Sequence, residues 1–371
     1  MKRFFKMILI LILLIVVVSI GYLYLNPEFG AAISKKEKEL YQLSPQWDGS
    51  KFVNTSHTEV EIGLKNIPGL LRKQFFETDG RRPVADLEVF AFDSISWQQD
   101  QIDNKIIWFG HSTALLKMNG LNMLIDPMFG DDISPVAPFK SARYSKNTID
   151  IIDILPPIDA VFISHDHYDH LDYRSIKKLK NKVNHFYVPL GVGRHLEKWG
   201  VSSDKITQLD WWDDLNISNV VVTFIPARHF SGRGLTDRGE SLWGGYTFIS
   251  DSMRIFWSGD SGYDSHFKEI GEKLGPFDWA FVECGQYNEF WHAIHMYPEE
   301  AVQAALDVNA SIAVPIHWGA FTLALHDWKD SVKRFSLEAK NKNLPVAMPG
   351  LGNVLELKAV PSGEFWWQIV D

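Results

Sequence analysis

The stretch that most constrains this chain is F-I-S-H-D-H-Y-D-H-L-D, residues 162–172, which sets three histidines and three aspartates directly after an apolar run. Titratable side chains at this density cost free energy in a folded protein unless they are paired or bind a metal. The pattern H-x-H-x-D-H is expected by chance in only roughly one such chain per thousand. The stretch therefore predicts a metal site, with His165, His167, Asp169 and His170 as candidate ligands.

Three further candidate ligands also follow apolar segments that are typical of buried strands. Segments 160–164, 220–228, 253–259 and 312–316 directly precede His165, His229, Asp260 and His317, respectively. Ligands gather at the carboxyl ends of strands in open α/β sheets, so four strands can bring these side chains to one rim. His165 and His167, two apart in an extended segment, point to the same side, whereas Asp169 and His170 come after the strand, where the chain can turn.

The ligand types favour zinc, with manganese or iron as alternatives, because the set holds imidazoles and carboxylates and no sulfur. The single cysteine, Cys284, excludes an intrachain disulfide and a cysteine-based zinc cluster, and we interpret it as a small buried side chain. Seven ligands exceed one tetrahedral sphere and suit two ions. We expect one ion to be bound by His165, His167 and His229, and the other by Asp169, His170 and His317. Asp260 is expected to bridge the two ions. Two such ions can lower the pKa of a shared water and stabilise charge on attacking and leaving oxygens.

The N-terminus carries Lys2, Arg3 and Lys6, followed by nineteen residues, 7–25, without a charge. As a helix this run spans about 28 Å, close to the thickness of the hydrocarbon core of a bilayer. A cleaved signal peptide is the alternative, but its apolar region is usually only about 7–15 residues long. The length therefore favours an uncleaved anchor, and the basic flank predicts a single-pass protein of the cell membrane with an extracytoplasmic catalytic domain.

Five segments make up the predicted organisation: a basic flank (1–6), a transmembrane anchor (7–25), a stalk (26–50), an N-terminal extension packed on the catalytic domain (51–104) and the catalytic domain itself (105–371). In the last segment short apolar strands alternate with helical patterns, and Asn119-Gly120 marks a β-hairpin. This alternation predicts an α/β fold in which helices cover sheets. The net charge of −9, without a basic stripe, argues against a nucleic-acid partner and a nuclease.

At its candidate ligands the chain resembles the metallo-β-lactamase-fold hydrolases, whose H-x-H-x-D-H motif is matched by residues 165–170. Within that family it resembles the N-acylphosphatidylethanolamine-hydrolysing phospholipase D branch, and the resemblance covers roughly residues 45–370. The matching stretches include W-F-G-H-S-T (108–113), L-I-D-P-M-F (124–129), S-G-D-S-G-Y (258–263), V-E-C-G-Q-Y (282–287) and P-I-H-W-G-A-F (315–321). The resemblance implies an αββα sandwich with two zinc ions between its sheets.

The resemblance also suggests further site residues. His295 in A-I-H-M-Y-P-E-E-A is expected near the substrate phosphate, where it can donate a proton to the leaving oxygen, and we expect it to be catalytic together with Asp169. His292 lies close to it and is the competing candidate. His111 is expected either to support the metal shell or to be a core histidine. Trp243 and other aromatic residues near the motifs are candidates for an apolar cleft, with core packing as the alternative.

The sequence therefore predicts a membrane-anchored di-zinc hydrolase that cleaves a phosphodiester, releasing N-acylethanolamine and phosphatidic acid from N-acylphosphatidylethanolamine. A lactonase of the same fold is the alternative enzyme, because the same attack opens a lactone. A di-iron redox protein and a non-catalytic anchored binding protein are alternatives from other classes. The expected partners are a phospholipid substrate and the membrane, and the oligomeric state stays open.

Overall fold

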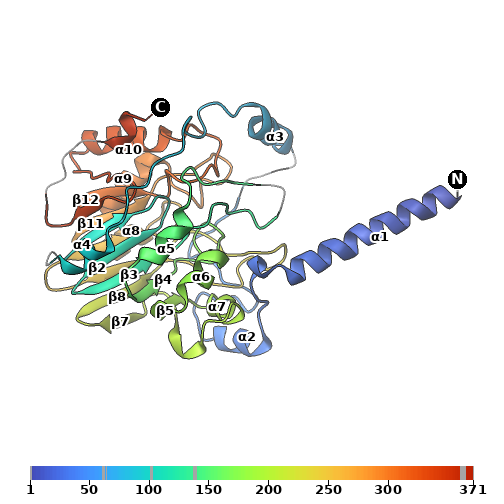
Figure 1. The fold of residues 1–371 in the computed structure, drawn as a ribbon, viewed down its shortest axis with the longest axis horizontal. Helices are drawn as coiled ribbons and strands as arrows, with labels where there is room; N and C mark the ends of the chain where they lie inside the picture. Colours follow the sequence, from blue (N-terminus) through green and yellow to red (C-terminus); the bar gives the residue numbers. More distant parts are fainter. Residues whose placement is uncertain are drawn as a thin grey trace.

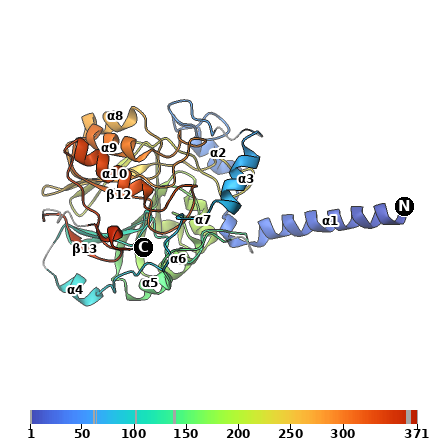
Figure 2. The same ribbon diagram turned by 90° about the horizontal axis from the view of Figure 1, so that it is seen from above.

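Two mixed sheets lie face to face between two layers of helices in a computed structural model of the 371-residue chain (Figures 1 and 2). The structure describes residues 2–60, 63, 65–100, 103–136, 140–359 and 365–370. The first sheet consists, in spatial order, of β13 (Val354–Glu356), β1 (Lys105–Trp108), β2 (Ala114–Met118), β3 (Leu121–Ile125), β4 (Ile158–Phe162), β5 (Val183–Pro189) and β6 (Ile206–Leu209). The second consists of β12 (Ala310–Ile316), β11 (Phe277–Glu283), β10 (Arg254–Trp257), β9 (Gly245–Ile249), β8 (Val220–Ile225) and β7 (Asp214–Ile217). The predicted αββα layering is confirmed.

Helices cover the outer face of each sheet (Figure 2). The first sheet is covered by α5 (Ile151–Ile154), α6 (Tyr173–Leu179) and α7 (Gly193–Lys198), and the second by α8 (His266–Leu274), α9 (Pro298–Asp307) and α10 (Asp330–Asn341). Before the first strand come α1 (Lys2–Leu25), α2 (Lys35–Tyr41), α3 (Ile67–Phe76) and α4 (Ser94–Gln99). Short 3-10 helices span Pro27–Phe29, Thr148–Asp150, Ser203–Lys205 and Trp366–Gln368.

The apolar strands of the sequence are buried on both faces. In β4, Phe162 packs between the sheets, with its ring centroid 5.1 Å from those of Tyr246 and Phe248, whereas Val161 packs against the helix layer. The predicted hairpin joins β2 and β3, and Asn119 and Gly120 both have positive φ, as a tight hairpin turn requires. The sequence did not indicate β5, β6, β7 or β13. The last three lie at sheet edges and are only partly buried, so they lack a continuous apolar run, and Asn184 and His185 interrupt the run in β5.

Helix α1 projects from the domain with its apolar side chains exposed, and by length and composition it is able to cross a membrane (Figure 1). The residues that follow it contact the domain at once. Trp199 Nε1 donates to Pro27 O at 2.8 Å, Arg194 Nε donates to Ala31 O at 2.9 Å, and Ala31 N donates to His195 Nδ1 at 2.9 Å. The segment predicted as a stalk, 26–50, is thus bound to α7 from its first residues.

The N-terminal extension joins the main core. Tyr41, Trp47 and Phe52 are buried, and their ring centroids lie 5.0–5.5 Å apart. Phe52 N also donates to Gly239 O at 2.8 Å, which fixes this part of the chain against the loop between β8 and β9. Residues from before the first strand therefore reach the end of the sandwich where the candidate ligands lie.

Candidate metal centre

Four strands lead to candidate ligands at one rim of the sandwich. β4 of the first sheet leads to His165, and β8, β10 and β12 of the second sheet lead to His229, Asp260 and His317. All four side chains are almost fully buried, with exposed fractions of 1–3%. Because the two sheets face each other, both of them contribute candidate ligands to the same rim.

His165, His167 and His229 bring three ring nitrogens together. His165 Nε2 lies 2.9 Å from His167 Nδ1, and His229 Nε2 lies 3.2 Å from the same Nδ1. One proton on that nitrogen can serve only one of these contacts well, whereas a cation placed among the nitrogens satisfies all three. Nitrogens that bind one tetrahedral zinc ion at about 2.0–2.1 Å lie about 3.3 Å apart. The observed spacing therefore fits a metal ion.

The second group consists of His111, Asp169, His170 and His317, whose ligand atoms all lie within 4.8 Å of one another. His111 Nε2 lies 2.7 Å from Asp169 Oδ2, so the histidine that the sequence left ambiguous is a buried partner of an expected ligand. The backbones of His111 and His317 also pair, because His317 N donates to His111 O at 2.9 Å. Both residues have positive φ, 55° and 66°, a strained conformation that is concentrated at functional sites.

Asp260 lies between the two groups. Its Oδ2 is 3.2 Å from His170 Nε2 and 3.8 Å from His165 Nε2, and its Oδ1 is 3.1 Å from His317 Nδ1. Among the described residues, these contacts of Asp260 Oδ1 and His170 Nε2 do not have the geometry of a hydrogen bond, although both atoms are buried. Buried polar atoms in proteins are almost always paired. These two atoms are therefore suited to bind a metal.

Burial sets the protonation of the site. It lowers the pKa of His165, His229 and His317 well below the usual value of a histidine. For Asp260, burial alone raises the pKa, but the rings of His170 and His317 outweigh it and hold the pKa well below its usual range. For His170, burial lowers the pKa, but Asp260, Asp169 and Asp126 outweigh it and raise the pKa well above the usual value of a histidine. Metal ions bind neutral imidazoles and ionised carboxylates, so a bound ion would replace the proton on His170.

Two residues that the sequence did not single out hold the loop that carries the candidate ligands, residues 164–172. Asp126 accepts hydrogen bonds from Ser164 N and Ser164 Oγ, both at 2.7 Å, and its Oδ2 lies 2.9 Å from His170 Nδ1. The contact turns the other ring nitrogen of His170 toward Asp260. Arg233 donates to the carbonyl oxygens of Asp166, Leu171 and Glu28. The matched stretch L-I-D-P-M-F contained Asp126, but nothing local indicated its role.

His295, and not His292, lies at the rim. Its ring centroid is 5.0 Å from that of His229 and 5.2 Å from that of His317. His295 Nδ1 lies 3.6 Å from Oε1 of Glu283, which is fully buried. Burial raises the pKa of Glu283 to about 7, although the His295 ring acts in the opposite direction. His292 Nε2 is instead paired with the Glu300 carboxylate at 2.8 Å.

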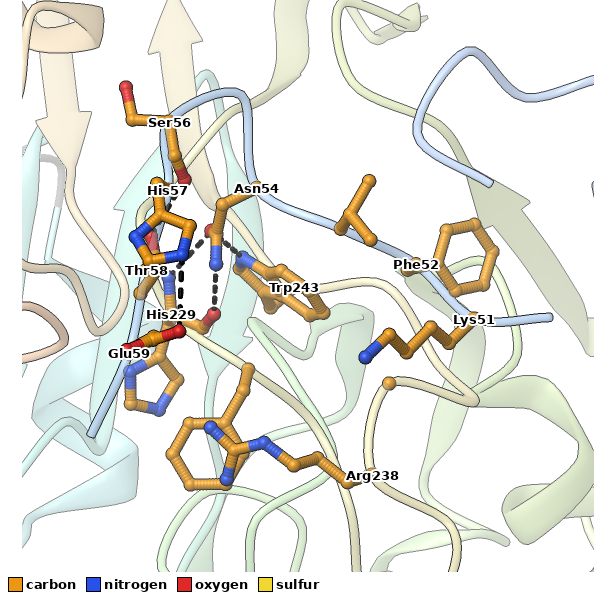
Figure 3. A pocket seen from close by; sticks show the side chains of 13 residues that line it. Lys51, Phe52, Asn54, Ser56, His57, Thr58, Glu59, His229, Arg238 and Trp243 are labelled. Atoms are coloured by element: carbon orange, nitrogen blue, oxygen red, sulfur yellow. Dashed lines mark hydrogen bonds and ion pairs between the residues drawn. The ribbon is translucent and has the colours of Figure 1, made fainter. Parts of the chain in front are cut away.

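A cavity of about 440 Å³ opens onto the first histidine group at His229 (Figure 3). Its wall combines the N-terminal extension with the loop between β8 and β9, and it includes Lys51, Phe52, Asn54, Phe230, Arg238 and Trp243. Asn54 joins the two parts: its Nδ2 donates to His229 O at 2.8 Å, and its Oδ1 accepts from His229 N at 3.0 Å and from Trp243 Nε1 at 3.1 Å. Trp243, a candidate for an apolar cleft, thus lines the cavity beside the site.

Comparison with known sequences agrees with this geometry. Residues 121–318 match the profile of the Beta-lactamase superfamily domain. An uncharacterized protein of Mycobacterium tuberculosis is 42% identical over 272 residues, which cover 71% of this chain and 72% of the relative. The N-acyl-phosphatidylethanolamine-hydrolyzing phospholipase D 1 of Caenorhabditis elegans is 34% identical over 233 residues, covering 60% of this chain and 65% of that protein.

Solved structures show the same fold. Igni18, a metallo hydrolase from Ignicoccus hospitalis, aligns with a TM-score of 0.53 at 19% identity and covers 68% of this chain and 97% of its own. CmlA, a diiron β-hydroxylase from Streptomyces venezuelae, aligns with a TM-score of 0.51 at 15% identity, covering 69% of this chain and 55% of its own. From the profile match, the relatives and the buried histidine–aspartate rim, the chain belongs to the metallo-β-lactamase superfamily and is a metal-dependent hydrolase.

Proposed function

We propose that this protein is a di-zinc phosphodiesterase that releases N-acylethanolamine and phosphatidic acid from N-acylphosphatidylethanolamine. The observation that carries the proposal is the position of Asp260 between two separate groups of buried ligands. Two cations on either side of one carboxylate suit phosphodiester displacement, because both cations can stabilise the negative charge on the phosphoryl oxygens. Relatives from Caenorhabditis elegans and Saccharomyces cerevisiae, 34% and 31% identical, bear the name of this activity and support the choice of substrate.

The chain's own residues divide into two metal-binding groups and a bridge. One ion is assigned to His165, His167 and His229, the other to Asp169, His170 and His317, and Asp260 contacts both. When bound, the ions supply a water of lowered pKa and positive charge at the phosphate. Manganese or iron also suits these ligands, so the zinc assignment is tested separately by elemental analysis.

Two side chains are positioned to move protons. Asp169 Oδ2 lies 2.7 Å from His111 Nε2 and would also hold the second ion, so Oδ1 is the atom that would accept the proton of the attacking water. His295 has Glu283 at Nδ1, which leaves Nε2 to donate a proton to the departing ethanolamine oxygen. The phosphorus–oxygen bond to that group breaks as the bond to the water oxygen forms. The two products are an alcohol and a phosphomonoester.

The proposal places the part of the substrate next to the phosphate in the cavity beside His229. Phe52, Phe230 and Trp243 line it, and the volume of about 440 Å³ leaves room for part of an acyl chain or for a headgroup. Aromatic walls also reduce the access of bulk water to the rim, which strengthens the charge interactions there.

We also propose that α1 remains attached as a single-pass anchor, with residues 105–371 as an extracytoplasmic catalytic domain and 51–104 as an extension packed on it. The segment just after α1 supports this reading. His195 accepts a hydrogen bond from Ala31 N, and Arg233 donates both to Glu28 O and to the loop that carries the candidate ligands. Cleavage near residues 31–34 would remove these contacts from the finished protein.

The decisive experiment offers two substrates to the purified, zinc-loaded full-length protein. N-acylphosphatidylethanolamine in mixed micelles should be hydrolysed, with phosphatidic acid and N-acylethanolamine detected by mass spectrometry. Efficient opening of acyl lactones without any turnover of the phospholipid would identify a lactonase and refute the phosphodiesterase. Elemental analysis should find about two zinc ions per chain.

The anchor is tested on the protein isolated from cell membranes. N-terminal sequencing should begin at residue 1 or 2, and protease added to intact cells, or to spheroplasts where an outer membrane shields the protein, should digest the catalytic domain. A mature chain that begins near residues 31–34 would show that α1 is a signal peptide.

A further inference from the structure

Two cationic side chains of the cavity wall have no place in the proposed reaction. Lys51 comes from the N-terminal extension and Arg238 from the loop between β8 and β9, and both extend into the cavity (Figure 3). Neither side chain has a hydrogen-bond acceptor or an ion-pair partner within the part of the chain that the structure describes. In a chain of net charge −9, two cations without a paired anion beside a candidate metal site call for an explanation.

The backbone brings the two cations together. Phe52 N donates to Gly239 O at 2.8 Å, so the residues next to this bond, Lys51 and Arg238, lie on neighbouring segments. Gly239 has φ +78°, and a Cβ there would lie 3.1 Å from Lys51 Cβ and 3.1 Å from Phe52 O. The close approach of the two segments therefore favours glycine at this position.

Arg238 is connected to the metal site through one aromatic ring. Its guanidinium carbon lies 3.7 Å from the centroid of Phe230, within the range of a cation–π contact. The Phe230 ring centroid is in turn 4.5 Å from that of His167 and 5.0 Å from that of His229. One ring thus separates Arg238 from the first histidine group.

The carboxylate that lines the same cavity is not paired with either cation. Glu59 Oε1 lies 3.1 Å from His57 Nε2, and Glu59 makes no ion pair with Lys51 or Arg238 among the described residues. Asp48 accepts the backbone N–H of Lys51 rather than its ammonium group. Asp237, next to Arg238 in sequence, accepts hydrogen bonds from Arg233 N and Gly234 N.

We propose that Lys51 and Arg238 form a binding subsite for a second anionic group on the substrate, a carboxylate on the phospholipid headgroup next to the bond that is cleaved. The proposal rests on the proposed function for its choice of a phospholipid. The scissile phosphodiester carries one negative charge, which we expect to lie at the rim with the candidate metal ligands. A neutral ethanolamide leaves the two cations without a partner, whereas an N-acylserine headgroup adds one carboxylate on the leaving group. Substrates of this class are therefore preferred over their neutral counterparts.

The first test measures binding without catalysis. Glycerophosphoserine and glycerophosphoethanolamine differ by one carboxylate, and each is titrated into the zinc-loaded full-length protein by calorimetry. Two partly exposed ion pairs should make the serine compound bind roughly five- to tenfold more tightly at low salt. The preference should shrink as ionic strength rises, because exposed charges are screened.

The second test measures hydrolysis of N-acylphosphatidylserine and N-acylphosphatidylethanolamine with identical acyl chains. The ratio of their kcat/KM values should favour the serine lipid by a similar factor. In the double variant Lys51→Ala/Arg238→Ala both the binding preference and the kcat/KM ratio should fall to about one. The charge-conserving Lys51→Arg/Arg238→Lys variant should keep a preference, and Lys333→Ala, on the outer helix α10, should leave it as in the wild type.

The outcomes separate this proposal from the proposed function. Equal binding of the two glycerophospho compounds to the wild type, or a preference that survives the double alanine variant, overturns the subsite. A serine preference in binding together with no hydrolysis of either lipid leaves the subsite standing and refutes the phosphodiesterase. Circular dichroism and zinc content of each variant show that the fold and the site are intact.

Discussion

The metal-binding rim and the cation-bearing wall of the cavity lie side by side but differ in how their charges are held. At the rim, Asp260 and the histidines around it are 0–3% exposed, and these histidines lie within 4 Å of Asp260. On the wall, Lys51 and Arg238 are exposed and have no ion-pair partner among the described residues. Charges interact strongly in a buried site and weakly in water, so changes at the rim should abolish function whereas changes on the wall should adjust it.

The largest expected effect is that of Asp260→Asn. The bridge loses its charge while its shape is kept, so the two ligand groups no longer share an anion. Activity should fall below detection, and zinc content should drop to about one ion or fewer per chain, as measured by elemental analysis. Asp251→Asn, at an exposed turn, is the matched control and should leave both unchanged. Full activity in Asp260→Asn would show that charge at the rim is no more important for activity than charge on the cavity wall.

His295→Ala should lower kcat by roughly 10²- to 10⁴-fold, because the variant lacks the proposed proton donor. KM should change much less if His295 acts mainly in the transition state. His292→Ala is the control, since its ring pairs with Glu300 away from the rim. If KM rose while kcat stayed unchanged, His295 would contribute to substrate binding, as the cavity wall does, and not to the chemical step at the rim.

Asp126→Asn should weaken zinc affinity by roughly 10- to 100-fold, the usual cost of losing a residue that orients a metal ligand. The mutant amide keeps the bulk but loses the charge that faces His170 Nδ1. Competition with a fluorescent zinc chelator measures the change. At saturating zinc most of the activity should return, whereas a loss that zinc does not restore would show that Asp126 acts on more than metal binding.

Asn54→Ala should have the smallest effect on chemistry. It removes the three hydrogen bonds that join the N-terminal extension to His229 and Trp243, and it should lower the free energy of unfolding by roughly 1–3 kcal/mol. Urea unfolding measures this loss, with the exposed Asn184→Ala as control. Zinc content should remain about two per chain. Loss of zinc in this variant would mean that the wall is part of the metal site.

Much of the rim could be predicted because its signals are local. The H-x-H-x-D-H spacing and the apolar strands before His229, Asp260 and His317 are visible in the sequence, and the structure brings these side chains to one place. Their roles as ligands stay a prediction that metal analysis must test. Asp126 and Glu283 lie in the matched stretches L-I-D-P-M-F and V-E-C-G-Q-Y, but their roles were not recognised, because these depend on contacts with His170 and His295 that only the fold creates.

The sequence by itself determined the family fold, the hairpin at Asn119-Gly120 and the set of candidate ligands, because each depends on short-range pattern or on a motif. Only the tertiary structure decided what surrounds them. The backbone hydrogen bond from Phe52 N to Gly239 O holds the segments of Lys51 and Arg238 side by side, although they are far apart in the chain. Arg233 joins the residues after α1 to the loop with the candidate ligands. Such contacts depend on how separate segments pack against each other. The hydrophobic pattern of one segment does not indicate which other segment it contacts.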